Sequence, residues 1–189
     1  MDDEVAQPEN KAVAQQKQPL KTHVLKTGDS FGNYRVVKCL CDGLIAQYYH
    51  MQHIRDLHDV TVGIFHHCTF GDEKFIQRLE TLRKTLSRFE NEGIPKIHDV
   101  TTLNERVCIF LDPVQGHTLS QHFSAHGSPG QAGVGIESSM RLIAQLLGVL
   151  GYAHSQGVDH RDLESDLIYV NGDGSIQILG LGIKAALGV

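Results

Sequence analysis

The strongest candidate for a catalytic residue in this sequence is Asp162. It lies in the loop of residues 160–167, which reads HRDLESDL. An aspartate carboxylate held in a loop can accept a proton from a substrate hydroxyl as a general base. Group transfer also needs positive charge or a metal ion where negative charge develops. The neighbours of Asp162 supply little of it, because Glu164 is an acid and Leu167 is an apolar residue that cannot bind a metal. The loop therefore contains a possible general base without the positive charge or metal ligand that group transfer also requires.

A second group of reactive side chains lies on segments that we predict to be neighbouring strands. Cys39, Cys41, His66 and Cys68 are zinc-ligand types, so a zinc site is an alternative that the sequence leaves open. One-residue spacing along a flat strand is poorly suited to a tetrahedral site, however, and cysteine is a common core residue. We therefore predict no metal site. No Ser/His/Asp or Cys/His arrangement has motif-level support.

Composition indicates a cytoplasmic protein of single-domain size. The chain has 189 residues, of which 41% are hydrophobic, enough to bury a sizeable core. Its formal net charge of -5 gives no reason to expect binding to nucleic acid or to an anionic membrane. The longest apolar run, Leu142 to Ala153, is too short to cross a bilayer, so no membrane segment is expected. The four cysteines form no CxxC pair, which fits reduced thiols.

The pattern of apolar residues predicts short strands and helices after a polar N-terminal segment. Residues 1–25 are poor in large apolar side chains and are predicted to be a flexible tail. Apolar residues at spacings of three and four from Phe75 to Phe89 predict a helix. The sequence NGDG at residues 171–174 predicts a hairpin turn. The predicted strands are Tyr34–Leu40, Ala46–Ile54, Val60–His66, Lys96–Thr101, Arg106–Leu111, Leu167–Val170 and Ser175–Leu179, and the longest helix is Ile136–Gln156.

This order of elements, together with the loop of residues 160–167, resembles a protein kinase over roughly residues 28–189. In kinases the loop reads H-R-D-L-x-x-x-N, where the aspartate orients the substrate hydroxyl and the asparagine binds magnesium. The resemblance implies an α+β, protein-kinase-like fold, with a five-stranded antiparallel N-lobe sheet and one main helix (residues 26–111). A hinge and a truncated, mostly helical C-lobe follow (residues 112–189). Residues 28–35, GDSFGNYR, look most like bacterial Ser/Thr kinases of the eukaryotic type.

The N-lobe positions that would hold a nucleotide are degenerate relative to that family. The Gly-rich loop retains only Gly43, and the lysine of the V-A-I-K strand is replaced by Phe65. The helix glutamate that pairs with this lysine is replaced by Leu82, although Glu80 stands two residues away and leaves a shifted alignment open. Apolar groups often replace a buried ion pair without loss of stability. We therefore expect Phe65 to dock the helix against Leu82 without any nucleotide.

The C-lobe positions that would hold magnesium are also changed. The first residue of the D-F-G motif is Gly180, and the asparagine of the catalytic loop is Leu167. The lysine that follows the catalytic aspartate by two residues is Glu164, so a cation has become an anion. Charge on a transferring phosphoryl group would have no stabiliser. The resemblance therefore implies no intact cofactor site and leaves Asp162 as a vestigial catalytic residue.

Two tyrosines replace aliphatic residues that enclose adenine in the family. Tyr48 takes the place of the residue above the base, and Tyr169 takes the place of the residue below it. Two rings from opposite sides would fill much of the pocket, which is the interpretation we favour. A widened pocket that stacks a ligand between them is the alternative, because aromatic faces also accept flat ligands.

The apolar scaffold of the family is retained where its polar catalytic groups are lost. Active kinases stack four residues through both lobes, and the matching residues here are Leu86, Ile97, His160 and Leu181. A chain drifting without selection on its fold should lose both sets. The pattern therefore favours a folded domain that is used for binding.

The long helix of the partial C-lobe has more than one apolar face, from Leu142 to Leu150. A complete kinase covers such a helix with segments that would follow the hairpin. An exposed apolar surface marks an interface or an incomplete chain. We expect this face to contact a protein partner or a second copy, or the remainder of a longer chain.

Together these patterns favour a catalytically inactive, kinase-like domain that acts as a protein-binding or regulatory module in the cytoplasm. No cofactor is expected. Two alternatives stay open: an atypical or residual Ser/Thr protein kinase, which would use ATP and magnesium, and a sensor that binds ATP without turnover.

Overall fold

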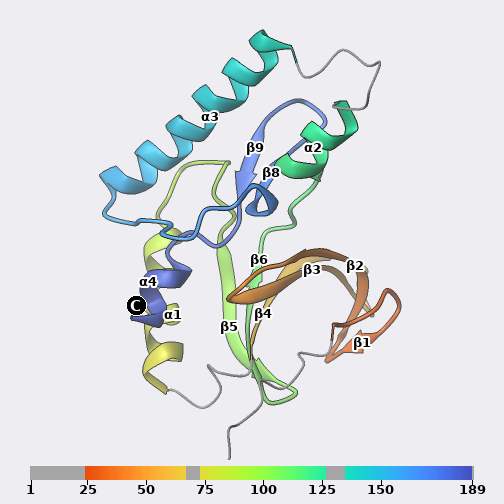
Figure 1. Cartoon of the computed structure of the whole chain (residues 1–189). Coiled ribbons are helices and arrows are strands. Elements are labelled where there is room, and N and C mark those ends of the chain that lie inside the picture. The colour runs from red at the N-terminus through yellow and green to blue at the C-terminus, as the bar shows by residue number, and fades with distance from the viewer. Residues whose placement is uncertain (1–23, 67–72, 127–134, 189) are drawn as a thin grey trace, which may run out of the picture.

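The N-terminal half of the chain folds into a curled antiparallel sheet in the computed structural model, which describes residues 24–66, 73–126 and 135–188 (Figure 1). The sheet has six strands in the order β1-β2-β3-β4-β6-β5, and all neighbouring pairs are antiparallel. The strands are β1 (Ser30–Phe31), β2 (Tyr34–Asp42), β3 (Ala46–His53), β4 (Asp59–Phe65), β5 (Ile97–Leu103) and β6 (Arg106–Leu111).

The prediction of five strands was therefore wrong by one. The additional strand is β1, which has only two residues and pairs with the start of β2. Gly32 adopts a positive φ of 58° and, with Asn33, turns the chain back so that Phe31 lies opposite Tyr34. A two-residue strand carries no periodic signal, so its pattern in the sequence could not reveal it.

Alternating side chains of the sheet enter two separate cores. On β3, Tyr48 belongs to the core shared with the helices, while its neighbour Tyr49 belongs to a second core inside the curl of the sheet. On β4, Phe65 belongs to the core shared with the helices, and Ile64 belongs to the core inside the curl of the sheet. This is the two-residue period of a strand, with both faces buried. It explains why β4, which reads DVTVGIF, is apolar along most of its length.

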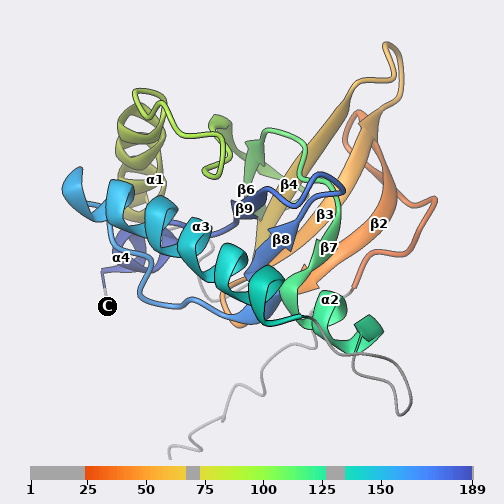
Figure 2. The same cartoon turned by 90° about the horizontal axis from the view of Figure 1, so that it is seen from above.

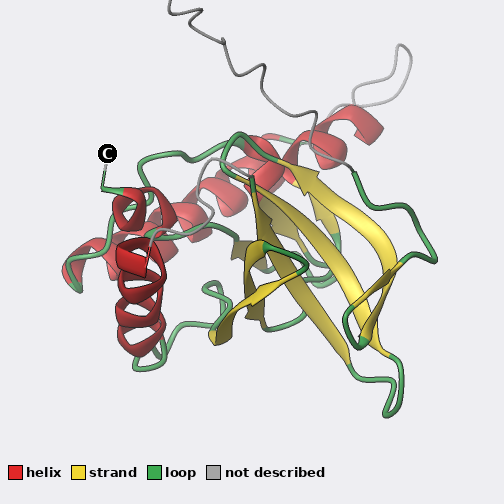
Figure 3. Ribbon diagram, turned by 90° about the horizontal axis from the view of Figure 1, so that it is seen from below, coloured by secondary structure: helices red, strands yellow, loops and turns green. Residues whose placement is uncertain are grey.

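The helix α1 (Glu73–Leu86) packs beside β5 and against α4 (Ile183–Leu187), as Figures 1 and 3 show. Its buried residues are Phe75, Leu79, Leu82 and Leu86, spaced as expected for one face of a helix. The ring of Phe65 meets Phe75 edge-on, with 5.0 Å between the ring centroids. This contact joins β4 to α1.

The second half of the chain is built around a small sheet and two helices (Figure 2). Strands β7 (His117–Thr118), β8 (Ile168–Val170) and β9 (Ile176–Ile178) form it in that order. Helix α2 (Leu119–His126) follows β7, and α3 (Ile136–Ser155) lies along the β8–β9 hairpin, where Gln145 donates to the backbone oxygen of Gly174 at 2.9 Å. A 3₁₀ turn (Ser165–Leu167) leads into β8.

Part of the predicted flexible tail, residues 1–23, lies outside the described residues, as does Cys68 of the candidate zinc ligands. At the described end of that segment, the backbone nitrogen of Leu25 donates to the hydroxyl of Tyr49 at 3.1 Å. Within the described ranges, no helix combines the length and the apolar character needed to cross a membrane.

Candidate functional site

The loop of residues 160–167 is fixed to the core through its histidine. His160 is buried, and its Nε2 donates to the backbone oxygen of Leu179 at 2.7 Å, while its Nδ1 accepts from the backbone nitrogen of Asp162 at 3.4 Å. These two contacts specify a neutral ring with its proton on Nε2. Burial lowers the pKa of His160, although the contact with Leu179 and the charge of Asp162 oppose that shift. The residue after it, Arg161, has a positive φ of 63°.

The carboxylate of Asp162 is paired with a lysine that sequence reasoning missed. The Nζ of Lys184, on α4, lies 2.8 Å from Asp162 Oδ1, and the two side chains are 33% and 19% exposed. The residues are 22 positions apart, and the short helix that brings them together follows the Gly180–Gly182 segment. The sequence contains no spacing signal for this pair, because its geometry depends on the path of the chain after the hairpin. Asp162 therefore has a cation beside it, although not from position 164.

Tyr48 occupies space that the backbone of β4 leaves open at Gly63. A Cβ atom at position 63 would lie only 2.9 Å from Tyr48 Cε1 and 2.9 Å from Ile109 Cγ1. The phenol ring therefore rests directly on the glycine of β4. Its hydroxyl reaches Gly180, where a Cβ atom would lie 3.4 Å from the oxygen. One ring thus extends from the sheet to the segment where the resemblance places the magnesium-binding motif.

The second tyrosine enters from the C-terminal half. Tyr169, on β8, is buried and donates from its hydroxyl to the backbone oxygen of Leu40 on β2, at 2.9 Å. This hydrogen bond joins residues that are 129 positions apart. Burial raises the pKa of both Tyr48 and Tyr169, and the nearby Cys41 thiol raises them further. Both phenols therefore remain protonated at neutral pH and can donate hydrogen bonds.

The loop between β2 and β3 closes over this region. His66 anchors it, because its ring Nε2 lies 2.8 Å from the backbone oxygen of Gly43 and its backbone nitrogen donates to Ile45. The β2–β3 loop, Tyr48, the 160–167 loop and α4 line a cavity of about 20 Å³. Sites for drug-sized ligands have volumes of roughly 300–1,000 Å³. This cavity has room for about one water molecule.

The two positions that would carry magnesium ligands have other roles. Leu167 is buried in the main core. Gly180 has a positive φ of 84°, a conformation that an L-residue would adopt only with strain. Neither residue offers an oxygen ligand from its side chain. The nearby carboxylate of Asp166 accepts hydrogen bonds from Thr118 and Ser120, which tie the loop to the start of α2.

The residues that replace the lysine and glutamate of the N-lobe are both apolar and buried. Phe65 and Leu82 belong to the same core, but the ring contact of Phe65 on α1 is with Phe75. Leu82 instead lies against Gly182, where a Cβ atom would approach its Cδ1 to 2.5 Å. Leu82 therefore packs α1 onto the segment that leads into α4.

The four residues expected to connect the two halves are all buried. Leu86, Ile97 and Leu181 belong to the main core, and His160 is 4% exposed. They come from α1, β5, the segment before α4 and the 160–167 loop. The described halves thus share one apolar core.

No protein-family model matches the chain. Its curated relatives include the serine/threonine-protein kinase PrkC of Bacillus subtilis (23% identical over 156 residues) and the probable serine/threonine-protein kinase pknA2 of Bifidobacterium longum (26% over 158 residues). Each match covers 82% of this chain. CBL-interacting protein kinase 25 of rice is 30% identical over 100 residues, or 53% of the chain. The chain spans 20–23% of the length of these three relatives.

The solved structures give the same result. The kinase domain of Mycobacterium tuberculosis PknI superposes with a TM-score of 0.63 at 22% identity, over 85% of this chain and 64% of that one. This chain has a protein-kinase-like fold. Its relatives are Ser/Thr protein kinases, as the resemblance of the 160–167 loop indicated. These three relatives come from two bacteria and a plant, so a bacterial source stays a prediction.

Proposed function

We propose that this kinase-like domain is catalytically inactive and acts as a cytoplasmic protein-binding or regulatory module. The proposal rests on the packing of the Tyr48 ring against Gly63 of β4, and on the small cavity, about 20 Å³, that Tyr48 lines next to the 160–167 loop. The rigid ring of Tyr48 takes the volume that an adenine base would need. It packs against Gly63 on one side, and its hydroxyl reaches Gly180 on the other. Leu167 and Gly180 add that two magnesium ligands of the family are missing. The buried free thiols of Cys41 and Cys108 fit a reducing compartment.

Thermal unfolding with ATP, with and without Mg²⁺, tests this proposal. A ligand that binds the folded state raises the melting temperature by mass action. We expect no shift with ATP under either condition at concentrations that saturate ordinary kinases. A shift that requires Mg²⁺ would contradict the proposal.

A residual kinase is the second candidate, and the ion pair between Asp162 and Lys184 favours it. Lys184, beside Asp162, could supply the positive charge that kinases obtain from the lysine at the position of Glu164. Under this alternative, transfer of the labelled γ-phosphate of ATP to the chain or to a generic protein substrate would be detectable. It would disappear in both Asp162→Asn and Lys184→Met, because the base and the cation are each required.

A nucleotide sensor without turnover is the remaining alternative. It requires the two tyrosines to separate and take the base between them. A melting shift with ATP that is independent of Mg²⁺ and is lost in Tyr169→Leu would support it. The proposed inactive module predicts no difference between that variant and the wild type in their response to ATP.

The surface proposed for protein binding is the outer stripe of α3. Four apolar residues on it are between 51% and 85% exposed, namely Ile136, Met140, Ile143 and Leu147. Their spacings of four, three and four match the seam of a coiled coil. Exposed apolar residues that are aligned in this way mark a contact surface more strongly than scattered ones do. We propose that a helix with a similar stripe, from a partner or a second copy, packs against it.

A further inference from the structure

Three side chains with metal-binding groups converge at the tip of the β3–β4 hairpin. The tip is formed by residues 53–58, HIRDLH, between the end of β3 and the start of β4. Backbone hydrogen bonds close it, from the nitrogen of His53 to His58 and from the nitrogen of Leu57 to His53. This turn brings His53, Asp56 and His58 to the same side of the hairpin.

The three ligand atoms lie close to a common point. Nδ1 of His53 is 2.6 Å from Asp56 Oδ1, and Nδ1 of His58 is 2.7 Å from the same oxygen. All three atoms lie within 4.8 Å of one another. The two imidazole rings are stacked, with centroids 5.0 Å apart and an angle of 22° between their planes. Both rings therefore direct the same type of nitrogen atom toward one carboxylate oxygen.

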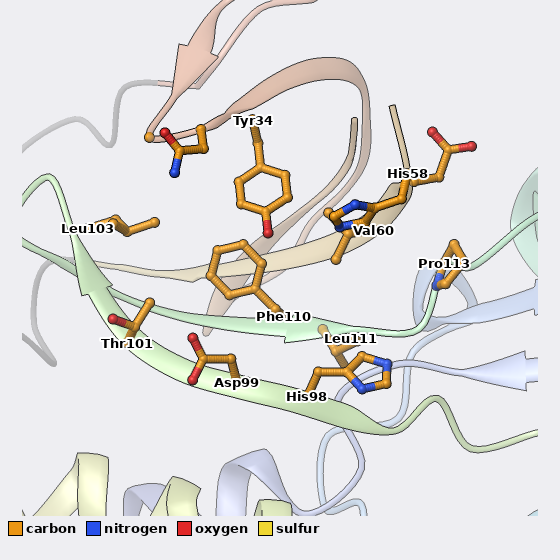
Figure 4. Close-up of a pocket in the computed structure, with 13 residues that line it drawn as sticks. Tyr34, His58, Val60, His98, Asp99, Thr101, Leu103, Phe110, Leu111 and Pro113 are labelled. Atoms are coloured by element: carbon orange, nitrogen blue, oxygen red, sulfur yellow. The ribbon is translucent and has the colours of Figure 1, made fainter. Parts of the chain in front are cut away.

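The rings are supported from the sheet by an aromatic side chain. The ring of Tyr34 meets His53 edge-on with centroids 5.1 Å apart, and meets His58 at 6.0 Å. Tyr34 in turn lies 5.1 Å from Phe110. Figure 4 shows Tyr34 and His58 on one side of a pocket of about 620 Å³, His98 and Asp99 on the other side, and Phe110 between them. Tyr34 thus contacts both histidine rings from the side of the sheet.

We propose that this hairpin binds a divalent transition-metal ion of the zinc class through Nδ1 of His53, Nδ1 of His58 and the carboxylate of Asp56. Two imidazoles and one carboxylate are an established donor set for such ions. Ligand atoms of a tetrahedral zinc site lie about 3.3 Å apart, given Zn–N and Zn–O distances of about 2.0–2.2 Å. The nitrogen–oxygen contacts would need to open by about 0.6 Å, which exposed side chains at a hairpin tip can provide.

Metal binding at Nδ1 requires each ring to carry its proton on Nε2. His58 and Asp56 are 52% and 62% exposed, so a change of tautomer at His58 places an N–H toward water at little cost. Three protein ligands leave a fourth position open on a tetrahedral ion. That position would take a water molecule or a donor atom of a small ligand.

A hydrogen-bonded turn without a metal is the competing explanation, and the chain contains a matched control for it. His98 Nε2 and Asp112 Oδ1 form another exposed pair, also 2.6 Å apart. Within the described residues, no third His, Cys, Asp or Glu joins this pair as a possible metal ligand. If an exposed His–Asp contact were sufficient for metal binding, substitutions at His98 and at the hairpin would have similar effects.

The test is a Zn²⁺ titration in competition with a coloured chelator, on the full chain without a histidine tag. We expect His53→Gln, His58→Gln and Asp56→Asn each to weaken Zn²⁺ binding by more than the roughly 10–100-fold that loss of a supporting residue costs. His98→Gln should retain wild-type affinity within about twofold. Circular dichroism and melting curves would verify that each variant is folded.

Two further readouts separate a metal site from a structural turn. Co²⁺ in place of Zn²⁺ should give the strong visible absorption of a tetrahedral complex, and Zn²⁺ should shift the NMR signals of the Tyr34 ring. Zinc affinity that is equal in the wild type and the three hairpin variants would overturn the proposal. An equal loss in His98→Gln would overturn it as well, because it would assign the binding to scattered surface histidines.

Discussion

At the scale of single residues, the candidate site is defined by pairs of substitutions that compensate each other. Tyr48 has the ring that fills the pocket, and Gly63 has the missing side chain that makes room for it. A kinase-like valine and alanine at these places would leave the pocket open. The Tyr48 ring would clash with a side chain at position 63, so the two positions should be energetically coupled.

We expect Gly63→Ala to destabilise the fold by about 1–3 kcal/mol, the usual cost of overpacking a core. The new methyl group would lie 2.9 Å from both Tyr48 and Ile109. Part of this cost should disappear in a Tyr48→Leu background, which removes the ring carbon from the contact. Urea denaturation of the two single variants and the double variant measures the coupling, which should be about 0.5–3 kcal/mol.

Tyr48→Phe is the matched control for this cycle. It keeps the ring carbons and removes only the hydroxyl, so Gly63→Ala should cost as much in the Tyr48→Phe background as in the wild type. Equal coupling with Phe and Leu would contradict the contact between the ring and Gly63.

A second prediction at this scale concerns His160. Burial lowers its pKa, and its hydrogen bonds hold the ring neutral. The unfolded chain therefore binds a proton more readily than the folded one, and stability due to His160 is complete above about pH 6.5 and falls as the pH decreases. The difference in unfolding free energy between the wild type and His160→Gln should shrink from about pH 7.5 to about pH 5, by at most about 1.4 kcal/mol per pH unit.

Glutamine is chosen because it keeps an N–H donor for Leu179 but does not titrate. The exposed His–Asp pairs contribute equally to both proteins and cancel in the difference. A difference that is constant with pH would mean that His160 is not held neutral by its surroundings.

At the scale of elements, the position of α1 depends on its contact with the segment that leads into α4. Leu82 packs where the side chain of residue 182 would be, and Gly182 also has a positive φ of 75°. The contact explains how the helix stays docked although the ion pair of the kinase family is absent. It joins the two halves of the domain through carbon atoms alone.

We expect Gly182→Ala to destabilise the fold by more than the matched variant Gly174→Ala. Both glycines have positive φ, so each alanine should cost about 1–2 kcal/mol in backbone strain. Only at 182 does a Cβ atom meet Leu82, at 2.5 Å, whereas at 174 nothing lies within 4 Å. Overpacking should add about 1–3 kcal/mol.

Denaturant unfolding of both variants measures the two costs on one scale. If the two alanines cost the same, backbone strain alone would account for both, and the packing of α1 through Leu82 would carry little energy.

The sequence predicted most elements because their signals are local. The spacing from Phe75 to Leu86 and the turn at residues 171–174 were sufficient for α1 and the β8–β9 hairpin. The pairing of Asp162 with Lys184, and of Phe65 with Phe75, depends on how segments far apart in sequence meet in space. No period in the sequence encodes such contacts. The cluster of His53, Asp56 and His58 is local in sequence, but the three side chains meet only because the β3–β4 turn brings them to one side of the hairpin.

At the scale of the whole molecule, the fold combines a small cavity next to the 160–167 loop with an exposed apolar stripe on α3. The chain's own residues join its two halves, through Leu82 against Gly182 and through the hydrogen bond from Tyr169 to Leu40. The outer stripe of α3 faces away from that core. Its buried side, with Leu142, Val149 and Ala153, already packs within the domain. The stripe is thus free to contact another helix without disturbing the fold.

We expect the isolated chain to self-associate through this stripe, and Ile143→Glu with Leu147→Glu to yield monomers. Burying two carboxylates in an apolar seam without partners is unfavourable, so the association should weaken strongly. Light scattering after size exclusion, over a range of concentrations, measures the mass. The control is Leu44→Glu, because Leu44 is as exposed as the stripe but lies on the β2–β3 loop. A wild-type chain that stays monomeric at high concentration would exclude pairing between copies, and an equal effect of Leu44→Glu would show that the stripe is not the contact.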